Sequence, residues 1–298
     1  MDILPPVINN EESYVMKKNI PVKRLLSLAI CSVLAGCGGN GSSGQSTTKS
    51  LDVRAIDGYL KGAQVWLDLN SDGLLTTGEP NATTDATGTA TLDVTAIATP
   101  TDYRLLVQAI ANQTEDVGDG TSGAVATKVT KSYVMSAPKG STVVTPLTTL
   151  VEQTMSAKGL TQEQAAQEVA TQLGLDSSKA TELLTDFMAS NSGTYQVYAS
   201  NLVGALPESG LSREAAESLL SKGSAIGKAI EAYLAQNPLD ASTKPSAIKV
   251  VLNVDGSVDD VIKDSDGDGQ DDDDIPPVPS DTLASFLLST SDMYMAGD

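Results

Sequence analysis

The segment Val65-Trp-Leu-Asp-Leu-Asn-Ser-Asp-Gly-Leu-Leu-Thr-Thr-Gly-Glu-Pro80 places the strongest constraint on how this chain folds. It begins with an apolar run, which predicts a buried strand. It continues as Asp-x-Asn-x-Asp-Gly, the pattern of loops that bind calcium through alternate oxygen ligands. Pro80 then prevents a helix from continuing beyond Glu79. The segment therefore predicts a polar loop on a β framework and excludes the helix-loop-helix of an EF-hand.

The loop has a competent residue at each ligand position of the twelve-residue calcium register when Asp68 is position 1. Gly73 falls at position 6, where the backbone turns sharply, and Leu75 at position 8 is expected to be an apolar anchor. The candidate ligands are Asp68, Asn70, Asp72, the carbonyl of Leu74, Thr76 and Glu79. The alternative is a solvated Asx turn without metal, but six compatible positions with glycine at the bend favour Ca²⁺ as the cofactor.

Composition excludes several functional classes. The 298 residues include no histidine, which removes Ser-His-Asp catalysis and histidine-based metal sites. The formal net charge of −19 argues against nucleic acid as a partner, because binding to phosphates requires basic patches. Aromatic residues make up only 4% of the chain, which argues against a stacking platform for sugars or bases. An acidic chain of this kind still suits hard cations.

The hydrophobic period changes near Pro146, from short alternating runs to a helical repeat. Strands are predicted at 51–56, 64–69, 87–94, 103–109, 128–135 and 142–145, and helices around 147–155, 165–173, 177–187, 195–206 and 212–234. Thr161 and Gln164 have the form of a capping box. Residues 248–262 predict a hairpin that turns at Asp255-Gly256 in type I′ and docks on the β domain.

These elements predict an α+β fold: an antiparallel β-sandwich followed by a small α-helical bundle and a C-terminal β-hairpin, with disordered termini. The expected parts are a leader and signal peptide (1–36), a flexible tether (37–50), a calcium-binding β-sandwich (51–145), a helical domain (146–244), a hairpin (245–262) and an acidic, proline-rich tail (263–298).

At the N-terminus, a basic stretch, Lys17 to Arg24, precedes a short apolar run that ends in Leu34-Ala-Gly-Cys37. This arrangement resembles a bacterial lipoprotein signal peptide, and Leu34-Ala-Gly-Cys37 matches the lipobox of that class. Met16 is the expected biological start, because the acidic residues before it are foreign to a signal peptide. The resemblance implies cleavage before Cys37, lipidation of its thiol and attachment to a membrane; the absence of Asp after that cysteine points to the outer membrane. The alternative is an ordinary secretory peptide.

The metal loop and the turn after it, Thr84-Asp-Ala-Thr-Gly-Thr-Ala-Thr-Leu92, resemble the calcium-binding B-type repeats of bacterial surface adhesins, relatives of carboxypeptidase-regulatory-like and Cna-B-like sandwiches. The likeness covers about residues 51–110. It implies a sandwich stabilised by Ca²⁺, with Asp68, Asn70, Asp72 and Glu79 as ligands. Thr89-Ala-Thr91 replaces the usual aromatic residue, and no Lys/Asn/Glu trio for an isopeptide crosslink is evident.

A second acidic run, Asp264-Ser-Asp-Gly-Asp-Gly-Gln-Asp-Asp272, resembles one unit of a thrombospondin type 3 repeat. Asp264, Asp266, Asp268 and Asp272 are weaker candidate ligands, because position 12 is Ile275. A weak calcium site and a solvated acidic linker are equally good interpretations.

Taken together, these patterns predict a lipid-anchored cell-envelope protein, exported by the Sec route, that acts as a surface adhesion or structural module with a protein or matrix partner. The alternative is a periplasm-facing lipoprotein that scaffolds an envelope complex. A hydrolase is the least favoured option: Ser136 and Lys139 have S-x-x-K spacing, but Pro138 and Gly140 spell a turn there instead of the helix that motif needs. We therefore expect no enzymatic activity.

Overall fold

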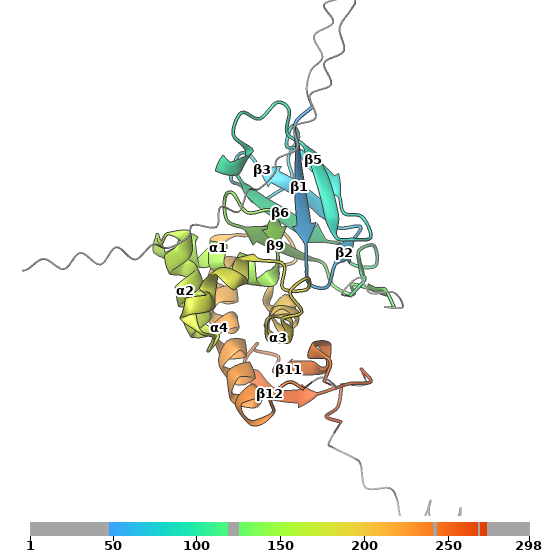
Figure 1. Cartoon of the computed structure of the whole chain (residues 1–298), viewed down its shortest axis with the longest axis vertical. Helices are drawn as coiled ribbons and strands as arrows, with labels where there is room; N and C mark the ends of the chain where they lie inside the picture. Colours follow the sequence, from blue (N-terminus) through green and yellow to red (C-terminus); the bar gives the residue numbers. More distant parts are fainter. Residues whose placement is uncertain (1–47, 119–124, 241–242, 268, 273–298) are drawn as a thin grey trace, which may run out of the picture. The chain divides into compact units, whose positions relative to one another are not determined.

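A computed structural model of the chain describes residues 48–118, 125–240, 243–267 and 269–272 (Figure 1). All of them belong to one compact unit. Several predicted features lie outside the described residues: the signal peptide, the lipidation site at Cys37, most of the tether, Asp268 and the tail beyond 272. In the described part of the chain, no helix has the length and apolar character needed to span a membrane.

The N-terminal half is built from three small sheets. The strands are β1 (Ser50–Ala55), β2 (Leu60–Lys61), β3 (Gln64–Asp68), β4 (Asn81–Thr83), β5 (Thr89–Asp93), β6 (Arg104–Ala109), β7 (Glu115–Asp116), β8 (Thr127–Lys128), β9 (Tyr133–Ala137) and β10 (Val143–Val144). They are ordered β4-β3-β6-β9, β10-β1-β5 and β2-β7-β8. All pairs are antiparallel except β1 with β10. The predicted strand at 128–135 is in fact two, because β8 and β9 belong to different sheets.

Successive side chains of β3 point to opposite faces of its sheet, as in any strand, and both faces are covered. Val65 and Leu67 point into the main core, which also contains residues of β1 and β5 from the facing sheet. Trp66 points to the opposite face, where it packs with Leu106 and Val134 under Leu211. The outer face of this sheet is therefore covered by a segment that follows the helices in sequence.

The described residues of the helical half form four α-helices and three 3₁₀ segments. They are α1 (Pro146–Lys158), α2 (Gln162–Gln172), η2 (Ser177–Leu184), α3 (Gly193–Leu202), η3 (Val203–Ala205), α4 (Arg213–Gln236) and η4 (Pro245–Ala247). A further 3₁₀ turn, η1 (Pro100–Asp102), lies between β5 and β6 in the N-terminal half. The predicted capping box at the start of α2 is confirmed, with Thr161 Oγ1 3.3 Å from Gln164 N and Gln164 Oε1 3.0 Å from Thr161 N. The predicted helix after Ser177 is a 3₁₀ segment instead.

Helix α1 is fastened directly to β9. Ser136 N donates to Thr149 Oγ1 at 2.9 Å, and the Thr148 hydroxyl donates to Ser136 O at 2.8 Å. The Ser136 hydroxyl in turn donates to Glu152 Oε2 at 3.1 Å. Buried residues of the sheets and of the helices form one continuous cluster. The boundary near residue 145 therefore marks a change of secondary structure inside a shared core.

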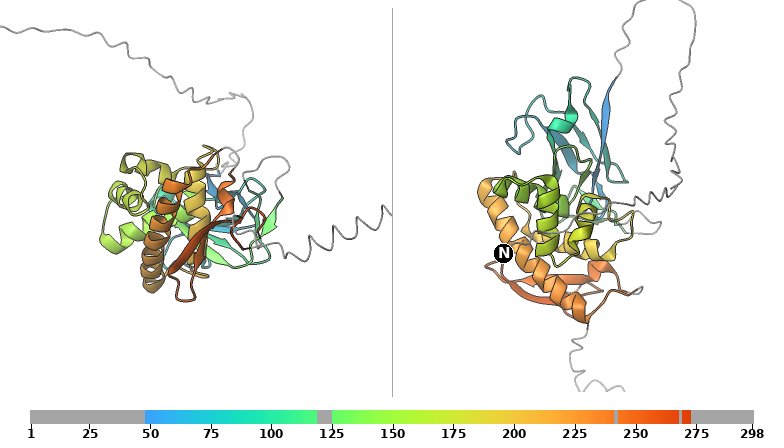
Figure 2. Two further views of the ribbon diagram at one scale, coloured as in Figure 1. Left: turned by 90° about the horizontal axis from the view of Figure 1, so that it is seen from below. Right: turned by 60° about the vertical axis from the view of Figure 1, so that its left-hand side comes forward.

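The hairpin β11 (Ile248–Leu252) and β12 (Val258–Lys263) forms a separate two-stranded sheet. It packs on α3 and α4, as both views of Figure 2 show. The prediction that it docks on the β domain is wrong, because the Asn201 amide of α3 bonds to Ile248 O at 2.8 Å and to Val250 N at 2.7 Å. The predicted type I′ turn is also wrong: Gly256 has a positive φ of 82°, whereas Asp255 does not.

Candidate metal centre

The loop from Asp68 to Glu79 connects β3 to β4. Asp68 is the last residue of β3 and is fully buried. Its Oδ2 accepts hydrogen bonds from Gly73 N at 3.0 Å and from Arg104 Nε at 2.8 Å. Gly73 has a φ of +76°, as expected of the residue at the bend. Positions 1 and 6 of the predicted register are thus joined by a hydrogen bond.

The second carboxylate oxygen of Asp68 is not used. Oδ1 is buried and has no hydrogen-bond partner among the described residues. A buried carboxylate oxygen without a donor carries a desolvation cost that proteins ordinarily avoid. A bound cation would supply the missing partner, and carboxylate oxygens are ligands that Ca²⁺ prefers.

The middle of the loop is held by short-range hydrogen bonds. Asn70 Oδ1 accepts from Asp72 N at 3.0 Å, and Asp72 Oδ1 accepts from Leu74 N at 2.8 Å. Asn70 Nδ2 lies 2.8 Å from Asp72 Oδ2 and 3.4 Å from Thr76 Oγ1. The side chains at positions 3, 5 and 9 are therefore neighbours.

Glu79 closes the loop at position 12. It is buried, and its two oxygens accept from Leu69 N at 2.8 Å and from Thr76 N at 2.9 Å. This arrangement draws the end of the loop back onto its beginning. Leu75, expected to be an apolar anchor at position 8, is 41% exposed instead, so that part of the prediction is wrong.

The loop does not form a ready-made cage. No group of three or more acidic or cysteine side chains is gathered closely enough to hold a metal ion in the described part of the chain. Glu79 is occupied with backbone amides, and the Asn70 amide turns its nitrogen toward Asp72. Binding of a cation would therefore require Asn70 and Glu79 to turn their oxygens toward Asp68 Oδ1, while the backbone register stays as it is.

Arg104 connects this loop to the helical half. Its Nη1 lies 3.4 Å from Glu152 Oε1 on α1, and its Nη2 lies 3.4 Å from Ser71 O in the loop. Burial raises the pKa of Glu152, and the nearby Asp68 raises it further, while Arg104 opposes both effects. Sequence reasoning missed Arg104, because nothing near Asp68 in the chain indicates which strand supplies the cation.

The loop also touches the segment that leads into α4. A Cβ on Gly73 would lie 3.3 Å from Leu211 N, and one on Gly210 would lie 3.2 Å from the Leu74 side chain. The segment is tied to the sheet by a hydrogen bond from Val134 N to Pro207 O at 2.8 Å. Strand β3, helix α1 and the start of α4 therefore meet at the loop.

The second acidic run folds in a similar way at its start. Asp264 is buried, and its oxygens accept from Gly267 N at 2.7 Å and from Gly269 N at 3.2 Å. Asp272 Oδ1 accepts from Ser265 N at 3.0 Å. Both oxygens of Asp264 have partners, Asp266 and Asp272 are exposed, and Asp268 lies outside the described residues. Among the described residues of this run, no buried oxygen lacks a partner as Asp68 Oδ1 does.

Asp57, a half-buried residue outside both loops, also has a buried carboxylate oxygen. Asp57 Oδ2 accepts from the Tyr133 hydroxyl at 2.8 Å, and Asp57 Oδ1 has no partner among the described residues. Burial, with the charge of Asp116 second, raises the pKa of Asp57 to about 7. The sequence showed only an Asp-Gly turn here.

Comparisons with protein-family models, with curated proteins and with solved structures found no match to this chain. The resemblance to adhesin repeats therefore rests on the loop and the turn that follows it.

Proposed function

We propose that the loop Asp68–Glu79 binds one calcium ion and that this ion braces the β sheets against the helical half of a lipid-anchored envelope protein. The observation that carries the proposal is the buried, unpartnered Oδ1 of Asp68 at position 1 of a complete calcium register. The ligands would be Asp68, Asn70, Asp72, the Leu74 carbonyl, Thr76 and Glu79.

The charge of the loop supports a divalent cation. The loop carries three carboxylates, Asp68, Asp72 and Glu79, and the one guanidinium beside them, Arg104, is shared with Glu152. The negative excess is concentrated in a short segment, and repulsion between these groups would fall when a cation binds.

A structural role fits better than a switch. The loop contacts elements from both halves of the chain, so a bound ion would fix the position of Arg104, Glu152 and Leu211 together. Extracellular modules commonly bind calcium with dissociation constants of roughly 10⁻⁴–10⁻³ M. At about 100 times the dissociation constant, a ligand that binds only the folded chain adds roughly 2.7 kcal/mol to the free energy of unfolding.

The test is differential scanning calorimetry of the full chain with Ca²⁺ and with EDTA. We expect a higher melting temperature with Ca²⁺ and no shift in Asp72→Ala, because Asp72 is exposed and its loss removes a ligand but little packing. Asp93→Ala is the matched control, since Asp93 is an exposed aspartate outside the loop, and it should keep the wild-type shift. A wild-type melting temperature that does not respond to Ca²⁺ would overturn the proposal.

If the bound ion holds the β sheets against the helical half, amide hydrogen exchange should change beyond the loop itself. Removal of calcium should increase amide exchange in the loop, in the segment 207–212 and at the start of α4, because these regions meet at the loop. Exchange in the hairpin β11–β12, which packs on α3 and α4, should change least. A calcium effect confined to 68–79 would show binding without bracing.

The lipid anchor is proposed from the signal-peptide pattern and the lipobox ending at Cys37. Mass spectrometry of the protein expressed in a Gram-negative host should show a lipidated N-terminal cysteine, and Cys37→Ser should abolish that modification. Protease accessibility on intact cells then decides between a surface module with a protein or matrix partner and a periplasm-facing scaffold. Detection of an unmodified, soluble chain would contradict the anchor.

A further inference from the structure

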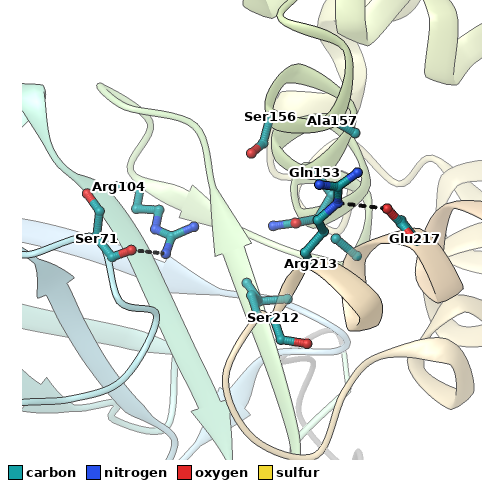
Figure 3. Close-up of a pocket in the computed structure, with 10 residues that line it drawn as sticks. Ser71, Arg104, Gln153, Ser156, Ala157, Ser212, Arg213 and Glu217 are labelled. Carbon is teal, nitrogen blue, oxygen red and sulfur yellow. Dashed lines mark hydrogen bonds and ion pairs between the residues drawn. The ribbon is translucent and has the colours of Figure 1, made fainter.

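The pocket beside the metal loop, of about 460 Å³, has charged side chains that are already satisfied within the chain. Arg213 pairs with Glu217, which also lines the pocket, and Arg104 pairs with Asp68. Figure 3 shows Arg213 directed at Glu217 and Arg104 at the backbone of Ser71. We therefore place no ligand there.

A second pocket, of about 370 Å³, lies where α2, α3 and α4 meet and is the groove considered next. Three half-buried leucines, Leu175, Leu234 and Leu239, line this groove and also pack against the main core. Tyr198 lines it as well, and Glu231 is the one carboxylate among its described lining residues. An apolar cavity of roughly 150 Å³ holds one benzene ring, so the groove has room for two large apolar side chains.

The described chain ends close to the start of the hairpin β11–β12. Asp272 N donates to Lys263 O at 2.7 Å, which ties the last described residue to the end of β12. Asp264, the residue after β12, donates its N–H to Ala247 O, also at 2.7 Å. Because Ala247 directly precedes β11, the turn η4 and Asp272 lie at the same end of the hairpin.

This end of the hairpin borders the groove. A Cβ on Gly193 would lie 3.3 Å from Pro245 Cγ, in η4, and 3.4 Å from Leu239 Cδ1, in the groove. Gly193 also directly precedes Thr194, another residue that lines the groove. The part of the chain that follows Asp272 therefore starts near the groove.

The sequence beyond Asp272 contains a segment whose chemistry matches the groove. A proline-rich spacer is followed by Thr282-Leu-Ala-Ser-Phe-Leu-Leu-Ser-Thr-Ser291, which has no charged residue although the chain has a net charge of −19. Its large apolar residues are Leu283, Phe286, Leu287 and Leu288. Leu283 follows Asp272 by 11 positions (283 − 272), a stretch that spans at most about 36 Å.

We propose that the segment Leu283–Leu288 of this same chain occupies the groove. Its apolar side chains would cover the three half-buried leucines, and its lack of charge suits a groove whose carboxylate is Glu231. A segment tethered at this distance has an effective concentration in the millimolar range, which favours it over a separate partner. A second copy is a poorer occupant, because the large negative charge of each chain opposes their association. The proposal is independent of whether the loop Asp68–Glu79 binds calcium.

Photocrosslinking of the full chain tests this contact. Phe286→p-benzoylphenylalanine places the photoreactive group in the segment, and mass spectrometry identifies the peptides it captures on irradiation. We expect crosslinks within one chain to peptides that contain Leu175, Tyr198 or residues 234–239. Val254→p-benzoylphenylalanine is the control, because Val254 is fully exposed in the hairpin turn and does not line the groove, so it should not capture these peptides.

Two variants of α4 locate the contact. Ala235→Glu adds a charge at an exposed position that lines the groove, and it should lower the crosslink yield from position 286 about tenfold, because docking would desolvate that charge. Ala232→Glu is the matched control: it adds the same charge at an exposed position of the same helix outside the groove, and should retain the yield. The proposal is overturned if position 286 captures no groove peptide, if it captures them only in crosslinked dimers, or if both variants lower the yield equally.

Discussion

The loops that begin at Asp68 and Asp264 have similar sequences and start with the same hydrogen bond, but they differ in the elements they connect and in the partners of their first aspartate. In each, the first carboxylate accepts a bond from the glycine amide five residues later, at 3.0 Å in one and 3.2 Å in the other. The first loop joins two strands of one sheet, and its aspartate pairs with Arg104. The second follows β12, and its aspartate accepts only backbone amides.

The difference shows what a local pattern can and cannot specify. Alternating carboxylates with glycine at the bend are sufficient to fold the start of the loop, because the bonds involved run between near neighbours. Of the two loops, only the first has a buried carboxylate oxygen without a partner among the described residues, Asp68 Oδ1, and this loop lies where β3, α1 and the start of α4 meet. We therefore place the metal in the first loop and make no proposal for the second.

The largest expected effect separates the two aspartates. Asp68→Ala removes a fully buried carboxylate and leaves the guanidinium of Arg104, whose side chain is 16% exposed, with only part of its partners. Breaking a buried ion pair on one side costs about 3–5 kcal/mol. Asp264→Ala removes hydrogen bonds to two backbone amides and should cost only about 1–2 kcal/mol. Urea unfolding with EDTA present measures both.

The control for this comparison is Asp68→Asn, which retains an acceptor for Gly73 N but lacks the charge. It should fall between wild type and Asp68→Ala. Equal losses in Asp68→Ala and Asp264→Ala would contradict the view that only the first loop is integrated into the core.

Much of this architecture follows from the sequence. The order of sheets, helices and hairpin was predictable because the hydrophobic period changes at Pro146 and because turns and caps are local signals. Asn70, Asp72 and Thr76, at positions 3, 5 and 9 of the register, are hydrogen-bonded neighbours because the bonds of the loop run between residues close in sequence; whether they bind a metal stays a prediction.

The parts that sequence could not supply depend on contacts between distant residues. Arg104 lies 36 positions from Asp68 in the chain, and Leu211 covers Trp66 from beyond three helices. Asn201 determines where the hairpin docks, through bonds to a strand that follows it by 47 and 49 positions. Each pairing is selected by tertiary packing, and no period or motif in the sequence encodes it.

The next largest expected effect is the pH dependence of the free energy of unfolding. It must be separated from the effect of metal before the two loops are compared. The pKa of Asp57 rises from an ordinary 3.8 to about 7 in the folded chain, because burial and Asp116 disfavour its charge. The folded chain therefore binds more protons than the unfolded chain between these values, and the free energy of unfolding should fall as pH rises from about 4 to 7. The expected loss is on the order of 3 kcal/mol.

Asp57→Asn should remove this pH dependence and stabilise the chain at pH 8, because the amide is neutral and still accepts from the Tyr133 hydroxyl. Urea unfolding at pH 4.5 and pH 8, with EDTA present, gives the two values for each protein. If wild type and Asp57→Asn lose the same stability between these pH values, the titration belongs to other groups.

The smallest expected difference in the free energy of unfolding comes from the glycine at position 6, the bend of each loop. Gly73 and Gly269 have φ values of 76° and 83°, so alanine is strained by about 1 kcal/mol at either position. At Gly73 the new Cβ would also lie 3.3 Å from Leu211 N and 3.4 Å from the Arg104 guanidinium, whereas at Gly269 nothing lies within 4 Å. We expect Gly73→Ala to cost about 2 kcal/mol and Gly269→Ala about 1 kcal/mol.

The chain's single tryptophan, Trp66, lies under Leu211 and provides the readout: its fluorescence should shift in Gly73→Ala and stay constant in Gly269→Ala. Equal costs with no change in Trp66 fluorescence would mean that Leu211 moves aside without an energetic cost. The packing of the first loop against the helices would then contribute no more than that of the second.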